Sequence, residues 1–151
     1  MILGLISDTH GLLRDSALRA MQNTGAIIHA GDVGDAKILE ALEKLAPVTA
    51  VRGNVDTAEW ATKLPATAVI KVDAVRIYVL HDVKELKLNS IPSGISIIVS
   101  GHSHKPGQST RGGILYINPG SAGPRRFNLP VTVARLDLAR QPWEAEFIDL
   151  S

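Results

Sequence analysis

Seven side chains that could bind metal ions follow short apolar segments of this sequence, each at the point where a segment ends. They supply carboxylate, carboxamide and imidazole groups, and they are Asp8, His10, Asp32, Asn54, His81, His102 and His104. This mixture of oxygen and nitrogen ligands suits Zn²⁺, Mn²⁺ or Fe²⁺ better than Ca²⁺, which prefers oxygen alone. Seven ligands are enough for two ions. The residue types therefore indicate a metal-dependent hydrolase.

The apolar segments that precede these ligands have the length and composition of buried strands. In the first third of the chain, residues 2–7, 26–30 and 48–52 predict strands, with helical patterns between them at residues 12–23 and 35–46. This alternation predicts parallel βαβ units. Ligands of open α/β sheets bind beyond the carboxyl ends of the strands, so we expect the seven side chains to meet at one edge.

The second part of the chain predicts further strands with tighter connections. Asp73-Ala74 separates two apolar runs and predicts a hairpin turn. A short helical piece is expected at residues 83–88. Strands are expected at residues 66–72, 75–80, 95–100, 113–118, 130–138 and 144–150, the last three in antiparallel arrangements. The predicted fold class is α/β, a two-sheet mixed β-sandwich flanked by helices, in a single domain spanning residues 1–151.

Composition restricts the classes of function. The chain has 151 residues, a formal net charge of +1 and no cysteine, so disulfides and thiolate metal sites are excluded. Near-neutral charge and 4% aromatic residues make nucleic acid an unlikely partner. No apolar run approaches the ~18 residues that span a membrane. No signal-like segment opens the chain, so we expect a soluble, cytoplasmic protein.

Five short motifs resemble those of the calcineurin-like metallophosphoesterases. The motifs are Asp8-Thr9-His10, Gly31-Asp32-Val33-Gly34-Asp35, Gly53-Asn54-Val55-Asp56, His81 and Gly101-His102-Ser103-His104. The short chain and Asn118-Pro119-Gly120-Ser121 resemble the small bacterial and archaeal phosphodiesterase branch. The resemblance implies a four-layer αββα fold. It also implies hydrolysis of small phosphodiesters, and possible hydrolysis of phosphomonoesters, with cyclic nucleotides and an assembly of identical chains left open.

The same resemblance implies two metal sites that share one carboxylate. Asp8, His10, Asp32 and His104 would hold the first ion, and Asp32, Asn54, His81 and His102 the second. Mn²⁺ is the expected metal, with Zn²⁺, Fe²⁺ or Ni²⁺ as alternatives. A hydroxide bridging the ions would attack phosphorus, and Asp32, Asn54 and His81 would form the catalytic centre.

The sequence departs from the family pattern beside two of the motifs. Many relatives have His after the Gly-Asn pair, where it protonates the leaving group, but this chain has Val55. General acid catalysis contributes roughly 10²–10⁴-fold, so poor leaving groups should react slowly. Asp56 either supplies that proton or orients Asn54. Asp82 replaces the usual Gly after His81, either as an acceptor for a ligand imidazole or as a loop carboxylate.

The remaining candidates carry weaker signals. His29 lies inside an apolar run and is expected to be an interior histidine, and Asp35 is expected to cap a helix. Trp60 and Trp143 are expected to pack in the core, and Asn118-Pro119-Gly120 to form a turn at the wall of the site. Surface charge and phosphate recognition are equally compatible with the arginines at positions 111, 125 and 126.

A non-enzymatic scaffold is the alternative function. The retromer scaffold subunit resembles the same family but serves as a protein-interaction module. All seven positions in this chain keep coordinating side chains, and this completeness favours catalysis.

Overall fold

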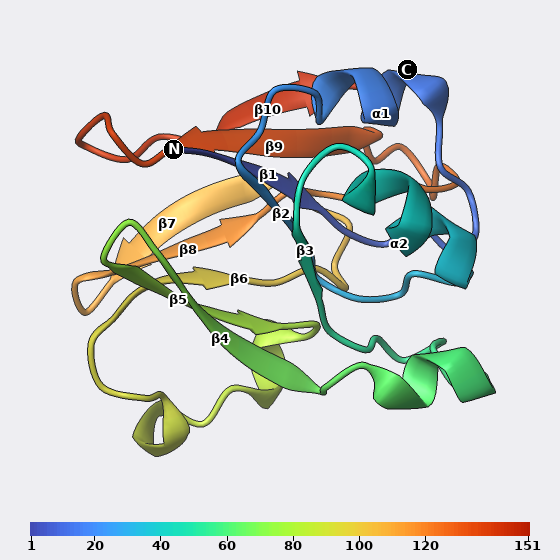
Figure 1. Ribbon diagram of the computed structural model, residues 1–151. Coiled ribbons are helices and arrows are strands. Elements are labelled where there is room, and N and C mark those ends of the chain that lie inside the picture. Colours follow the sequence, from blue (N-terminus) through green and yellow to red (C-terminus); the bar gives the residue numbers. More distant parts are fainter.

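The computed structural model describes residues 1–151, and its main feature is a pair of five-stranded sheets packed face to face (Figure 1). The first sheet has the strand order β10-β9-β1-β2-β3. Its strands are β1 (Ile2–Ile6), β2 (Ala26–His29), β3 (Val48–Ala50), β9 (Thr132–Asp137) and β10 (Glu146–Asp149). β1, β2 and β3 are parallel, as predicted, and β9 and β10 extend the sheet in antiparallel pairing.

Two helices connect the parallel strands of the first sheet. Both α1 (Asp15–Ala20) and α2 (Ala36–Glu43) are shorter than the predicted helices. The predicted N-cap of α2 is confirmed, because the Asp35 carboxylate accepts a hydrogen bond from the Lys37 N–H at 3.0 Å. Both helices pack on the outer face of this sheet, where Ile38 and Leu42 join a cluster of 12 buried apolar residues.

The second sheet has the order β4-β5-β6-β8-β7. Its strands are β4 (Thr67–Val72), β5 (Val75–Leu80), β6 (Ile95–Val99), β7 (Gly107–Arg111) and β8 (Ile114–Asn118). The hairpin between β4 and β5 is confirmed, and Asp73 and Ala74 both have positive φ (49° and 70°), as a tight hairpin turn requires. Strand β7 was not predicted, because it is an exposed edge strand with no apolar alternation. The antiparallel prediction for residues 113–118 was incomplete, because β8 also pairs in parallel with β6.

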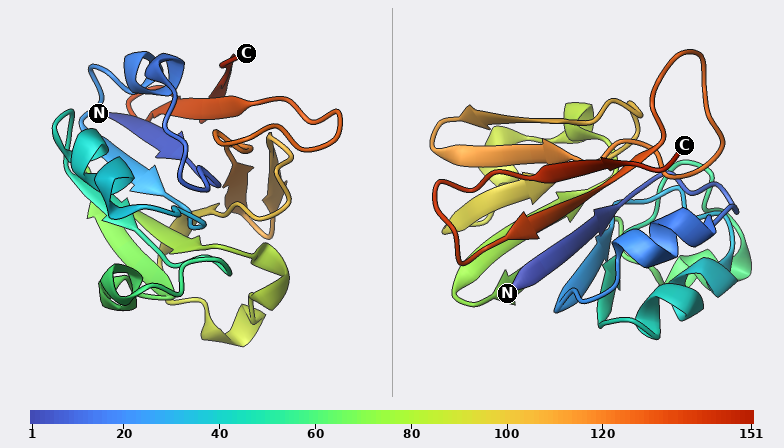
Figure 2. Two further views of the ribbon diagram at one scale, coloured as in Figure 1. Left: turned by 90° about the vertical axis from the view of Figure 1, so that its right-hand side faces the viewer. Right: turned by 90° about the horizontal axis from the view of Figure 1, so that it is seen from above.

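Helical cover is unequal on the two sides of the sandwich (Figure 2). The α-helices lie on the first sheet. Between β5 and β6 of the second sheet the chain forms only two 3₁₀ turns, η2 (Val83–Glu85) and η3 (Leu88–Ser90). These turns replace the helix predicted at residues 83–88. A further turn, η1 (Glu59–Lys63), precedes β4. The main core of 15 buried residues lies between the sheets. The predicted α/β two-sheet class is confirmed, and no helix has the length and apolarity to cross a membrane.

Backbone hydrogen bonds join the loops that follow the strands at one edge of the sandwich. The Asp8 N–H donates to the Gly31 carbonyl at 3.0 Å, and the His10 N–H donates to the Asp32 carbonyl at 2.9 Å. Across the second sheet, the Gly101 N–H donates to the His81 carbonyl at 2.9 Å. The loops after β1, β2, β5 and β6 are therefore tied to one another at the edge where the sequence placed the candidate ligands.

Candidate metal centre

The predicted ligands converge into two neighbouring groups. One is formed by Asp8, His10 and His104 and the other by Asp32, His81 and His102, and in each group the ligand atoms lie within 4.8 Å of one another. The seventh residue, Asn54, lines a groove together with His81, so it lies beside the second group. The structure thus brings together side chains that are up to 96 positions apart in the sequence.

The two aspartates lie between the groups. The Asp32 Oδ2 atom is 3.1 Å from His81 Nε2 and 3.6 Å from His10 Nε2. The Asp8 Oδ1 atom is 3.3 Å from His104 Nε2 and 3.8 Å from His81 Nε2. Each carboxylate therefore faces imidazoles of both groups, which is the arrangement that a bridging ligand needs.

Five of these seven residues have left-handed backbone conformations. The φ angles are 55° at Asp8, 47° at His10, 55° at Asp32, 69° at His102 and 62° at His104. Such conformations cost non-glycine residues about 1–3 kcal/mol each and persist where the surrounding structure imposes them. Four other non-glycine residues in the chain share this property. Strain is thus concentrated in the loops that aim the candidate ligands.

Asp8 is held by hydrogen bonds on almost every side. Its Oδ2 atom accepts from the Ser7 hydroxyl at 2.8 Å and from the His102 N–H at 3.1 Å. Its carbonyl accepts from the Ser121 hydroxyl and the Gly123 N–H, both at 3.1 Å. Only Oδ1 has no partner. Ser7 was not identified in the sequence, because an isolated serine carries no distinctive signal. Ser121 was noted only as the last residue of a motif, and its hydrogen bond to Asp8 was not predicted.

The loop between β3 and η1 holds the other carboxylate. The Val55 N–H donates to Asp32 Oδ1 at 3.0 Å. The buried Asp56 carboxylate accepts three backbone hydrogen bonds, from Val33, Gly34 and Gly53, at 2.9–3.1 Å. Because these N–H groups donate to both of its oxygens, Asp56 organises the loop around Asn54, and they favour its ionised form over the protonated form that a general acid needs.

Close backbone approach explains two of the glycines in the motifs. A Cβ atom at Gly53 would overlap the Asp32 carboxylate. A Cβ atom at Gly101 would overlap the Ser7 hydroxyl and press on Asp8. Neither loop could approach its aspartate with a larger residue at these positions.

Hydrogen bonds fix the orientation of the two buried histidines. His81 Nδ1 lies 2.8 Å from the Ala30 carbonyl, so Nδ1 carries the hydrogen and Nε2 faces the aspartates. His29 Nδ1 accepts from the Gly31 N–H at 3.2 Å, so Nε2 carries the hydrogen and donates to the Thr9 hydroxyl at 3.0 Å. Thr9 in turn donates to the Val33 carbonyl. His29 is a fully satisfied interior residue, as predicted.

Unpaired polar atoms at the centre fit a metal-binding role. Five buried side-chain nitrogen or oxygen atoms in the chain lack a hydrogen-bond partner, and four of them belong to candidate ligands. These four are Asp8 Oδ1, His10 Nε2, His81 Nε2 and His104 Nδ1. Leaving such atoms buried and unpaired is costly, and coordination to a divalent ion would satisfy them.

The mutual arrangement of charges shifts several pKa values. Burial acts to raise the pKa of Asp8, but the imidazoles of His10, His104 and His81 outweigh it and hold that pKa below its ordinary value. Burial also acts to raise the pKa of Asp32, and His81 and the Val55 N–H reverse this effect. Both carboxylates are therefore ionised at neutral pH.

The pKa of the His81 imidazole, which faces these carboxylates, shifts in the opposite direction. Burial acts to lower the pKa of His81, but Asp32, the Ala30 carbonyl and Asp8 together raise it to about 9. Without a metal, His81 therefore carries a proton at pH 7, and a metal ion bound there would displace that proton.

The turn after β8 supports the loop that carries two histidines. The Asn118 carboxamide donates to the Gly101 carbonyl at 3.0 Å and to the Ser103 hydroxyl at 3.1 Å, and it accepts from the Gly120 N–H at 2.9 Å. The expected turn is present, and its Asn118 side chain also binds the loop that carries His102 and His104. Asp82 lies on the other side of the loop, with Oδ2 3.6 Å from His102 Nε2.

The other sequence candidates lie outside the two groups. Trp60 and Trp143 pack against the two large apolar clusters, as predicted. The Arg111 guanidinium stacks 4.9 Å from the centre of the Tyr116 ring at the edge strand. Arg125 and Arg126 are exposed in the loop that precedes β9.

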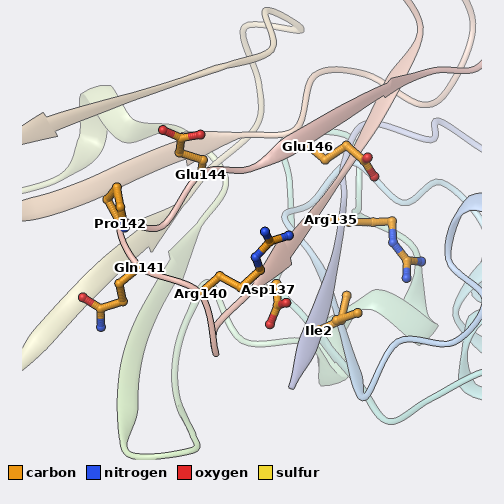
Figure 3. Close-up of a pocket in the computed structure, with 8 residues that line it drawn as sticks. All are labelled: Ile2, Arg135, Asp137, Arg140, Gln141, Pro142, Glu144 and Glu146. Carbon is orange, nitrogen blue, oxygen red and sulfur yellow. The ribbon is translucent and has the colours of Figure 1, made fainter.

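A separate pocket of about 480 Å³ lies at the amino-terminal end of β1, away from the ligands (Figure 3). Its charged lining residues are of both signs: Arg135, Asp137, Arg140, Glu144 and Glu146. Arg135 already donates to the carbonyls of Ala20 and Gln22 at the end of α1, at 2.7 Å. With no imidazole in its lining, this pocket does not share the chemistry of the metal centre.

Comparisons with known proteins agree with this geometry. Residues 1–141 match the family model of the calcineurin-like phosphoesterase superfamily domain. A probable metallophosphoesterase of Methanothermobacter thermautotrophicus is 31% identical over 150 residues, covering 91% of this chain and 87% of the relative.

Solved structures share the fold at lower sequence identity. The structure of an archaeal phosphodiesterase superposes with a TM-score of 0.82 at 21% identity, covering 98% of this chain and all of the other. The structure of Vps29 from Entamoeba histolytica in complex with Zn²⁺ gives a TM-score of 0.74 at 22% identity, with both chains fully covered. The family match spans most of the chain, and this protein belongs to the calcineurin-like phosphoesterase superfamily.

Proposed function

We propose that this protein hydrolyses small phosphodiesters with two divalent metal ions. The observation that carries the proposal is the convergence of two ligand groups, in which four buried side-chain atoms have no hydrogen-bond partner. Asp8, His10 and His104 would hold one ion, and His81, His102 and Asn54 the other, with Asp32 shared. Mn²⁺ is the favoured metal, and Zn²⁺, Fe²⁺ and Ni²⁺ are alternatives for the same nitrogen and oxygen ligands.

The residues of the chain would prepare this site for a phosphate group. Bound divalent ions would supply an activated water for attack on phosphorus and would stabilise the charge that develops there. Asp8 and Asp32 are kept ionised by their imidazole neighbours, and the Ala30 carbonyl aims His81 Nε2 toward them. The braced loops hold these groups in place before substrate arrives, which lowers the entropic cost of the reaction.

Protonation of the leaving group is the step for which the chain offers no side chain at the expected position. Val55 is 49% exposed and apolar, and the neighbouring Asp56 carboxylate accepts hydrogen bonds from three backbone N–H groups. We therefore propose a preference for phosphodiesters whose leaving groups depart without a proton, such as aryl esters, over alkyl phosphomonoesters.

A metal-dependent assay with one matched pair of variants tests the proposal. Wild type should cleave bis-p-nitrophenyl phosphate when Mn²⁺ is added, and Asp32→Asn should reduce kcat/KM by at least about 10³-fold because the shared carboxylate is lost. Asp35→Asn is the matched control, since asparagine is an equally good N-cap. Equal activity in wild type and Asp32→Asn, or activity that ignores added metal, would refute the proposal.

The alternative is an interaction scaffold, which the similarity to Vps29 leaves open. The orphaned ligand atoms favour the enzyme, because a scaffold has no need to keep them aligned. Metal analysis after loading with Mn²⁺ and dialysis separates the two functions: about two ions per chain supports hydrolysis. Fewer than one ion per chain, together with no hydrolysis, would favour the scaffold.

A further inference from the structure

A groove of about 320 Å³ opens directly beside the second ligand group. Asn54 and His81 are part of its lining, so a phosphorus atom bound at that group would have one of its substituents next to the groove. The groove lies between the loop after β3, the start of β4, the end of β5 and the η2–η3 segment. Its volume matches a single small-molecule group.

The wall of the groove offers apolar surface to a ring. Tyr78 and Leu80 come from the outer face of β5 and are 9% and 5% exposed, so they form the floor, and the half-buried Leu86 after η2 packs against them. A flat heterocycle can pack against an aromatic ring and two aliphatic side chains. Hydroxyl groups of Thr67 and Ser90 also line the groove and can bind the polar atoms of a sugar.

Two cations and one carboxylate lie among the groove residues. Arg52 comes from the loop after β3, where its N–H donates to the Pro65 carbonyl at 2.9 Å, and Lys87 lies between η2 and η3. Glu85 is the single acidic residue in the lining, so the groove has a net positive charge apart from its histidine.

Neither cation is neutralised by a partner. No lysine or arginine of this chain forms an ion pair with a carboxylate side chain. What distinguishes Arg52 and Lys87 is therefore their position next to Asn54 and His81. Two unpaired cations from separate elements can bind the oxygens of one phosphate group with charge-assisted hydrogen bonds.

We infer that this groove binds a nucleoside substituent of the phosphodiester, and that Arg52 and Lys87 select a nucleoside carrying a second phosphate. The heterocycle packs on Tyr78, Leu80 and Leu86, and the second phosphate lies between the two cations. This inference rests on the proposed function, because the metal centre must position the reacting phosphorus at Asn54 and His81. It adds a specificity that the metal ligands alone do not supply.

Two substrates with the same scissile bond isolate the second phosphate. They are thymidine 5′-(p-nitrophenyl phosphate) and the same compound with a 3′-phosphate, so the leaving group is p-nitrophenol in both. We expect kcat/KM to be about tenfold higher for the 3′-phosphorylated compound, the effect of one partly exposed charge-assisted contact. The preference should shrink in high salt, because the cations are exposed.

Substitutions then assign the preference to the two cations. Arg52→Met and Lys87→Met should each reduce the ratio of the two kcat/KM values several-fold, and the double variant should bring it close to one. Lys71→Met is the matched control, because Lys71 is exposed on β4 outside the groove lining. Its ratio should equal that of the wild type. Thermal unfolding of each variant establishes that the chain is folded.

A binding measurement makes the test independent of turnover. Calorimetry on the Mn²⁺-loaded protein should show thymidine 3′,5′-bisphosphate binding about tenfold more tightly than thymidine 5′-monophosphate, with the difference lost in the double variant. Equal affinities and equal kcat/KM values in the wild type would overturn the inference, as would a preference that survives the double variant. Absence of all metal-dependent hydrolysis would instead refute the proposed function, and the calorimetric comparison would still decide whether the groove binds a second phosphate.

Discussion

The two groups of candidate ligands lie side by side but differ in their exposure to solvent. In the first group, the side chains of Asp8, His104 and His10 are 0%, 5% and 14% exposed. In the second group, Asp32 and His81 are equally buried, but His102 is 41% exposed and Asn54 lies at the surface. One group is enclosed by protein, and the other forms the opening of the centre.

The hydrogen bonds follow the same division. Asp8 accepts bonds from Ser7, Ser121 and two backbone N–H groups, so its position is fixed before any ion binds. Asp82 Oδ2 lies 3.6 Å from Nε2 of the His102 ring, which is too long for a hydrogen bond. A site built in advance loses less entropy on binding. We expect the first group to bind its ion tightly and the second to exchange its ion and admit substrate.

The largest expected effect comes from removing one histidine of each group. His104→Ala should lose the enclosed ion, and His102→Ala should lose the exposed ion while keeping the other, because the backbone N–H of residue 102 still supports Asp8. Both variants should lose at least about a hundredfold in kcat/KM, since the proposed reaction uses both ions. Metal content after dialysis, measured by mass spectrometry, should fall to about one ion per chain in each.

The distinction between the two groups lies in the affinity of the ion that remains. The ion that remains in His102→Ala should resist removal by a chelator for longer than the ion that remains in His104→Ala. Ser109→Ala, on the exposed edge strand β7, should keep both ions and serves as the control. Equal chelator sensitivity of the two histidine variants would show that burial does not set the order of affinity.

A smaller effect concerns the pH dependence of stability. It arises from His29, which is buried and contacts Thr9 in the loop after β1. Burial lowers the pKa of His29 to about 4, against 6.5 in the unfolded chain, although the nearby Asp8 and Asp56 partly oppose the shift. Between these pH values the unfolded chain binds a proton that the folded chain does not, so stability falls as pH falls. The loss between pH 7 and pH 4.5 should be about 2 kcal/mol.

Denaturant unfolding of the metal-free protein at the two pH values measures this loss. His29→Gln removes the titrating group while keeping an acceptor for Gly31 and a donor for Thr9, so its stability should change less with pH. The pH-dependent difference between wild type and variant is the quantity of interest, because it cancels the other titrating groups. An identical pH dependence in both proteins would show that His29 is protonated without unfolding.

The sequence predicts the buried parallel strands better than the exposed edge strand β7. β1, β2 and β3 are short, apolar and bounded by glycine or polar residues, and their parallel arrangement follows from the helices between them. β7 has no such pattern, because Gln108, Ser109 and Thr110 face solvent on both sides of an edge strand. Its pairing with β8 is specified by tertiary contacts that local composition does not encode.

The same limit applies to the metal centre. The seven candidate ligands could be identified because their types and their positions after strands are both distinctive. The supporting contacts could not, since the bond from Ser121 to Asp8 and the bond from Asn118 to Gly101 join loops that are distant in the sequence. Asn118 was predicted only as part of a turn. The role of Asp56 was left open between two alternatives, and only the positions of three backbone N–H groups decide between them.

The smallest expected effect tests whether the exposed group can be tuned alone. Asp82→Asn removes the negative charge 3.6 Å from His102 while keeping an oxygen for the Lys84 N–H, which Asp82 now accepts at 3.0 Å. Carboxylates behind a metal-binding histidine typically contribute 10–100-fold in affinity, and the long contact places Asp82 at about tenfold or below. Competition with a fluorescent chelator should therefore show weaker binding of the second ion only. Asp35→Asn makes the same change at the cap of α2, where the carboxylate forms no ion pair with a histidine, and should leave both affinities unaltered. If Asp82→Asn weakened both ions equally, the two groups would act as one cooperative unit, and the division into an enclosed and an exposed site would not hold.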